Sequence, residues 1–110
     1  MSNQPESGEY DNVLSKYYGE EQVLAVITIK VDTKEADTIA SEIANQPSIE
    51  DVYLVTGDTD IVVKARFASY RELKEFVTRF LPNINGIKES KTLMVVTAYK
   101  EKGVKVEFEG

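Results

Sequence analysis

The hexapeptide at residues 55–60, Val-Thr-Gly-Asp-Thr-Asp, places a glycine among hydroxyl and carboxylate side chains between two apolar segments. Glycine adopts positive φ without strain and lets another group approach the backbone closely. Asp58 and Asp60 can each accept hydrogen bonds from nearby amides, so turn chemistry alone would account for both. Two carboxylates are too few oxygen ligands for a divalent cation. We therefore predict no metal site here, and a turn that could present its backbone to a ligand.

The composition restricts the chemistry open to the chain, because it contains no histidine and no cysteine. Imidazole bases, thiolate nucleophiles, disulfides and the commonest zinc ligands are thereby removed. No catalytic constellation is recognisable among the remaining residues, so we predict a protein that is not an enzyme and has no cofactor. Thirteen Lys and Arg against nineteen Asp and Glu leave a net charge of −6, which opposes direct binding to nucleic acid.

The first 22 residues differ from the rest of the chain, since they carry five acidic side chains and one lysine. We predict an acidic tail over residues 1–22, with a short helix over 10–18, and a single domain over 23–110. No segment approaches the roughly 20 apolar residues of a membrane span, and no secretory signal is recognisable. We expect a cytoplasmic protein that does not associate with a membrane.

Two copies of a strand, helix and strand pattern flank the hexapeptide. Each predicted helix carries apolar residues at positions i, i+3, i+4 and i+7 and begins with the spacing of a capping box. The first helix follows Asp32 or Thr33 and ends near Asn45, and the second follows Ser69 and ends before Pro82. The predicted strands span residues 23–31, 49–56, 60–68 and 87–99, with a turn at 101–103 and a short last strand at 104–108.

This order of elements predicts an α+β fold, a ferredoxin-like βαββαβ sandwich with a four-stranded antiparallel sheet and two helices on one face. The other face would expose more apolar surface than a monomer usually leaves in water. We predict a homodimer that forms through this face; the alternative is that residues 10–18 fold over it. The apolar residues expected on it are Leu24, Val26 and Val62 with either Leu93, Val95 and Tyr99 or Met94, Val96 and Ala98.

Several short segments occur in an order and spacing that is typical of one family. They are the run 52–57 before Asp60, the segment 73–76, Gly86 and Ile87 before the segment 90–92, and finally Tyr99 and Lys100. In these features, residues 23–102 resemble the effector-binding domain, or RAM domain, of the Lrp/AsnC family of transcription regulators, named after the leucine-responsive regulatory protein.

The resemblance implies a domain that dimerises through its sheet and assembles further, often into rings of dimers, with an amino acid bound where dimers meet. Exposed turn amides and a hydroxyl suit an α-carboxylate, and an aspartate suits an α-ammonium group. The family's pocket corresponds here to the loop residues Thr56, Gly57, Asp58, Thr59 and Asp60 and to Ser90, Lys91 and Thr92 at the start of the last strand of the sheet.

The chain departs from the family pattern in two places. Many members carry an aromatic residue just before the aspartate, where this chain has Thr59. That difference would leave the pocket more open or select a different side chain. Family regulators also begin with a helix-turn-helix domain, which an acidic segment of only 22 residues cannot form. The resemblance thus implies a stand-alone effector domain that lacks its own DNA-binding domain and modulates transcription by assembly with full-length Lrp/AsnC regulators.

Three other functions stay open from the sequence. A small enzyme on a dimeric ferredoxin-like barrel would use Lys64, Arg66 and Asp60, and an apolar cavity enclosed between sheet and helices would favour it. An ACT-type amino-acid sensor would instead hold its ligand at Asp32 and Thr33. The third possibility is a structural domain that oligomerises without a small ligand.

Overall fold

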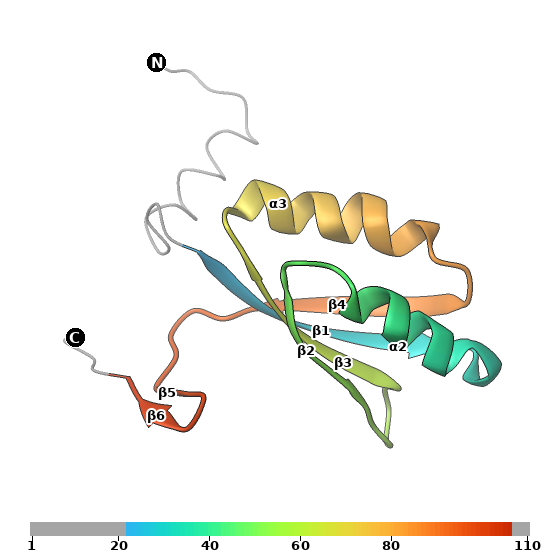
Figure 1. Cartoon of the computed structure of the whole chain (residues 1–110), viewed down its shortest axis with the longest axis horizontal. Helices are drawn as coiled ribbons and strands as arrows, with labels where there is room; N and C mark the ends of the chain where they lie inside the picture. The colour runs from blue at the N-terminus through green and yellow to red at the C-terminus, as the bar shows by residue number, and fades with distance from the viewer. Residues whose placement is uncertain (1–21, 107–110) are drawn as a thin grey trace, which may run out of the picture.

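The computed structural model describes residues 22–106 of the chain. Its core is a four-stranded antiparallel sheet in the order β2-β3-β1-β4, with α2 and α3 on one face (Figure 1). The predicted ferredoxin-like sandwich is therefore confirmed. The predicted tail, the helix over 10–18 and the end of the last strand lie outside the described residues. The strands of the sheet are β1 (Val23–Val31), β2 (Ile49–Leu54), β3 (Ile61–Phe67) and β4 (Ile87–Met94).

The two helical segments begin as the sequence predicts. The Asp32 carboxylate accepts from the Lys34 amide at 3.2 Å, before η1 (Thr33–Glu35) and α2 (Ala36–Ala44). Ser69 Oγ accepts from the Glu72 amide at 3.2 Å, at the start of α3 (Tyr70–Glu75). These side chains satisfy amides that the first helical turn leaves without partners.

The second helical segment is not a regular α-helix throughout. A π-helical turn, η2 (Phe76–Phe80), follows α3, and η3 (Leu81–Asn83) ends the segment. The Leu81 amide donates to the Phe76 carbonyl, which is the i to i−5 bond of a π-helix. Pro82 has no N–H, and its ring disfavours regular helix in the turn before it. The helical segment therefore continues one residue past Pro82, to Asn83, where the sequence analysis predicts an end before Pro82, and its last turns are distorted.

The hydrophobic core lies between the sheet and the helices. Alternate side chains of β1 and β3 point to the helices and are buried, because successive residues of a strand face opposite sides. The opposite face of the sheet, called the open face below, carries the residues between them. The buried core consists of Val23, Ala25, Ile27, Ile29, Val31, Ala36, Ile39, Ile43, Ile61, Val63, Ala65, Phe67, Leu73, Phe76, Leu81 and Ile84.

Strand β4 is shorter than the sequence analysis predicts, since it ends at Met94 and not at residue 99. The neighbouring strand β1, with which β4 pairs, explains the difference. Ala25 of β1 pairs with Met94, and the Val95 amide donates to the Leu24 carbonyl at 2.9 Å. Because β1 begins only two residues before Ala25, a longer β4 would find no further neighbour to bond.

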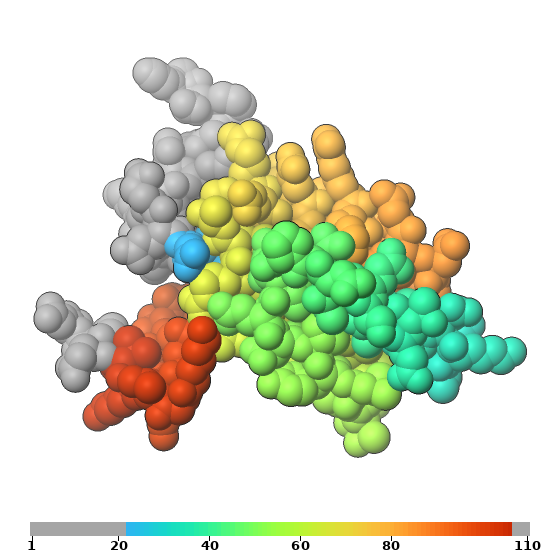
Figure 2. All heavy atoms as spheres, viewed as in Figure 1, coloured from blue at the N-terminus to red at the C-terminus, as the bar shows by residue number. Residues whose placement is uncertain are grey.

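The chain beyond β4 forms a separate hairpin of β5 (Lys100–Glu101) and β6 (Val104–Lys105). The predicted turn is present, with positive φ at Lys102 and Gly103. Figure 2 shows this hairpin as a projection beside the main body. Among residues 22–106, no helix is long and apolar enough to cross a membrane.

Candidate ligand-binding site

The loop between β2 and β3 is closed by a backbone hydrogen bond from the Val55 amide to the Asp60 carbonyl at 2.9 Å. Gly57 has a φ of 132°, a conformation that residues with a Cβ rarely adopt. No atom would crowd a Cβ at this position. The backbone conformation, and not a lack of space, therefore requires glycine here, as the sequence predicts.

Three hydrogen bonds hold this loop against the end of β1. The Thr59 hydroxyl and the Asp60 amide both donate to the Ile29 carbonyl, each at 3.0 Å. The Val31 amide donates to Asp60 Oδ2 at 2.9 Å. Asp60 and Thr59 thus position the loop, and the Asp60 carboxylate already has a backbone partner. Asp58 takes no part in these bonds.

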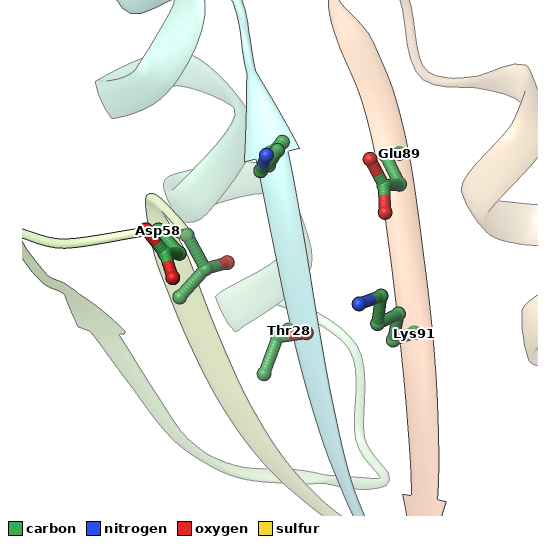
Figure 3. A pocket seen from close by; sticks show the side chains of 6 residues that line it. Thr28, Asp58, Glu89 and Lys91 are labelled. Carbon is green, nitrogen blue, oxygen red and sulfur yellow. The ribbon is translucent and has the colours of Figure 1, made fainter.

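A hollow of about 360 Å³ lies on the open face, where the loop meets the sheet. Figure 3 shows its side chains projecting from three segments, with Asp58 on the loop, Thr28 on β1, and Glu89 and Lys91 on β4. The register explains how they meet, since Lys91 lies opposite Thr28 and Glu89 lies opposite Lys30. The complete lining is Thr28, Lys30, Asp58, Thr59, Glu89 and Lys91.

The hollow contains some of the residues that the sequence analysis selected and not others. Asp58, Thr59 and Lys91 line it, whereas Thr56, Gly57 and Asp60 do not. Ser90 and Thr92 lie opposite Ile29 and Ile27, which places both on the helix side of the sheet. The sequence analysis missed Thr28, Lys30 and Glu89. Glu89 was predictable from the sequence, because residues two apart in a strand, such as Glu89 and Lys91, lie on the same face. Thr28 and Lys30 were not, because only the pairing of β1 with β4 places them beside Lys91 and Glu89.

The hollow gathers two cations, Lys30 and Lys91, and two carboxylates, Asp58 and Glu89. Within residues 22–106, all ion pairs closer than 4.0 Å involve other side chains, so these four charges have no partner there. An ammonium and a carboxylate on one small ligand could each meet an opposite charge in this site. The site therefore suits a zwitterion.

Four further charges, away from the hollow, are paired with one another. Arg66 Nε donates to Glu50 Oε2 at 2.6 Å, and Arg66 Nη2 also binds Glu101 of β5. Lys64 Nζ lies 3.7 Å from Glu50 and 3.5 Å from Glu101. The Arg66 hydrogen bond to each carboxylate lowers the pKa of Glu50 and of Glu101, and these bonds raise the pKa of Arg66. We call these four residues the ion-pair cluster.

The residues expected for the competing functions are engaged in structural contacts. Lys64 and Arg66 belong to the ion-pair cluster, Asp60 bonds the Val31 amide, and the Asp32 carboxylate caps a helix. On the helix side, the hollow between α3 and the turn before β2 is an open groove and not an enclosed cavity. Residues 22–106 contain no group of three or more acidic side chains arranged to hold a metal.

Taken together, these features describe a ferredoxin-like α+β domain with a polar hollow at one end of its open face. A family model of the Lrp/AsnC ligand binding domain matches residues 24–104. The chain therefore belongs to the Lrp/AsnC family of transcription regulators and represents its ligand-binding domain.

The curated relatives agree with this assignment. The HTH-type transcriptional regulator FL11 of Pyrococcus furiosus is 37% identical over 79 residues, which cover 72% of this chain and 52% of that protein. FL11 of Pyrococcus abyssi is 35% identical over the same length and coverage. The chain thus spans about half the length of the relatives that it matches.

Solved structures share the fold. A protein of Thermus thermophilus is 28% identical with a TM-score of 0.68, over 72% of this chain and 99% of that one. A transcriptional regulator of Neisseria meningitidis, solved as an L-Met complex, has a TM-score of 0.68 at 18% identity, over 94% of this chain and 63% of that one. At 18% identity, the similarity to the Neisseria meningitidis regulator shows a shared fold only.

Proposed function

We propose that this chain binds a free α-amino acid in the hollow on its open face and, as part of an oligomer, transmits that binding to the regulation of transcription. The observation that carries the proposal is the set of four charges in the hollow that form no ion pair with any side chain of residues 22–106. Lys30 would meet the α-carboxylate, and Asp58, on the neighbouring loop, would meet the α-ammonium group. The L-Met bound to the Neisseria meningitidis regulator supports the same class of ligand.

The first test is calorimetric titration and thermal unfolding with each of the twenty amino acids. We expect at least one of them to raise the melting temperature, since a ligand that binds only the native state stabilises it. In Asp58→Asn and Lys30→Gln, affinity should fall about tenfold or more, the cost of a lost charged hydrogen bond. Asp37→Asn and Lys34→Gln change exposed residues outside the hollow and serve as matched controls. Absence of binding by all twenty would contradict the proposal.

Oligomerisation is supported by the other end of the open face. Val26 of β1 lies opposite Leu93 of β4, and the Leu93 side chain is 58% exposed. Val96 and Tyr99, just after β4, are exposed as well. Leu93, rather than Met94, belongs to the open face, whereas residues 95–99 lie beyond the end of β4, where strand alternation no longer assigns them to a face. A second copy that covered these residues would leave the hollow at the rim of the contact, where dimers could meet around a ligand.

We therefore predict that Leu93→Glu lowers the native mass of the protein from that of an oligomer to that of a monomer. The introduced carboxylate would be buried without a partner in a sheet-to-sheet contact. Lys88→Glu, which alters an exposed residue of the same strand outside that apolar group, is the control. Native mass spectrometry with and without amino acids measures both assembly and bound ligand. An unaltered chain that is monomeric at millimolar concentration would exclude this part of the proposal.

A further inference from the structure

The lining of the hollow contains no apolar residue, since its six side chains belong to threonine, lysine, aspartate and glutamate. Pockets for small molecules are usually walled mainly by apolar and aromatic side chains. The apolar surface that the hollow offers comes only from the aliphatic stems of its charged residues and the methyl groups of its threonines, so an aliphatic ligand side chain would gain less here than in a pocket walled by apolar residues. Selection among amino acids in this hollow should therefore come mainly from polar contacts.

The charges are arranged in two halves across the sheet. Thr59 and Asp60 bond the Ile29 carbonyl, which holds the loop against the end of β1, and Asp58 of the loop and Lys30 of β1 both line the hollow there. On the far side of β1, Glu89 and Lys91 project from β4 (Figure 3). Each half thus holds one carboxylate and one ammonium group, and Lys30, which lies opposite Glu89, stands between the two halves. If Asp58 and Lys30 bind the α-groups of the ligand, Glu89 and Lys91 face its side chain.

The half formed by Glu89 and Lys91 carries no net charge, which decides the kind of side chain that it fits. A charged ligand side chain would pair with one of the two residues and bring a like charge to the other. A carboxamide satisfies both, because its NH2 donates to the carboxylate and its oxygen accepts from the ammonium group. We propose that the hollow selects amino acids with a carboxamide side chain, asparagine or glutamine, over aliphatic and acidic ones. This inference rests on the proposed function.

The selectivity can be measured with two sets of ligands of nearly equal size, one of Asn, Asp and Leu and one of Gln, Glu and Met. In calorimetric titration we expect the carboxamide of each set to bind at least about tenfold more tightly than its counterparts, as polar sites built for a hydrogen-bonding group do. Leu or Met binding as tightly as its carboxamide counterpart would overturn the inference and leave the proposed function standing. If no amino acid binds at all, the proposed function fails instead.

Variants of β4 separate selectivity from general binding. Glu89→Gln and Lys91→Met should bring the affinity ratio of carboxamide to aliphatic ligand close to one, because each removes a contact that only the carboxamide makes. Asp58→Asn should weaken both ligands equally, since it removes a contact with the α-ammonium group that they share. Lys88→Met alters an exposed residue of the same strand outside the hollow and is the matched control. An unchanged affinity ratio in both β4 variants would overturn the inference. Because Glu89 and Lys91 are both exposed, neither substitution should prevent folding, and the second variant still tests the inference if the first fails to fold.

Discussion

Replacing Asp60 with alanine should destabilise the domain by about 2–3 kcal/mol, the upper range for a hydrogen bond to a charged group whose partner is left buried and unsatisfied. The partner is the amide of Val31, a residue that is 4% exposed. Without the carboxylate, that amide loses its acceptor at the end of β1. Urea unfolding at neutral pH, analysed by linear extrapolation, measures the change.

Asp60→Asn separates two roles of this residue. Asparagine keeps a side-chain oxygen for the Val31 amide, so we expect it to cost about 1 kcal/mol or less. If Asp60 acts only by holding the loop, Asp60→Asn should also bind the amino acid almost as well as the unaltered chain. A variant of full stability that no longer binds would show that Asp60 contacts the α-ammonium group directly, as the family resemblance implies. That result would assign to Asp60 the contact with the α-ammonium group that we propose for Asp58.

Local sequence patterns were sufficient to predict the elements and the core. Apolar alternation places Ile27 and Val63 inside, Ser69 caps a helix, and Gly57 takes a positive φ. Each of these features depends on neighbours within a few residues, and such neighbours are visible in the sequence. The shortened β4 is different in kind, since its end at Met94 follows from the point at which β1 begins.

The site was predictable only in part for the same reason. The loop, with Asp58 and Thr59, is recognisable by its glycine and carboxylates. Lys30 is not, because it is an ordinary charged residue of a strand until the pairing of β1 with β4 sets it opposite Glu89. Nor does the sequence indicate that the Asp60 carboxylate is used by the Val31 amide, 29 residues away. Pairing between distant strands decides both points.

The ion-pair cluster provides the second large effect, since we expect Arg66→Met to destabilise the domain by about 1–2 kcal/mol at pH 7. Arg66 holds Glu50 of β2 and Glu101 of β5 at once, and its removal leaves two carboxylates with Lys64 alone. The side chains are about one quarter exposed, which places the effect between that of a surface pair and that of a buried pair. Arg71→Met changes an exposed arginine that takes no part in the ion pairs of residues 22–106 and is the control.

The penalty of Arg66→Met should depend on pH in a definite direction. Arg66 lowers the pKa of Glu50 and Glu101 below the ordinary value of 4.5, so the unfolded chain takes up protons before the folded one as the pH falls. The stability due to the cluster is therefore fully present above pH 4.5 and is lost as the pH falls through the lowered pKa values. We expect the difference between the variant and the unaltered chain in urea unfolding to shrink markedly from neutral to strongly acidic pH. An equal penalty at both ends would mean that Arg66 contributes through the packing of its aliphatic stem and not through its charge.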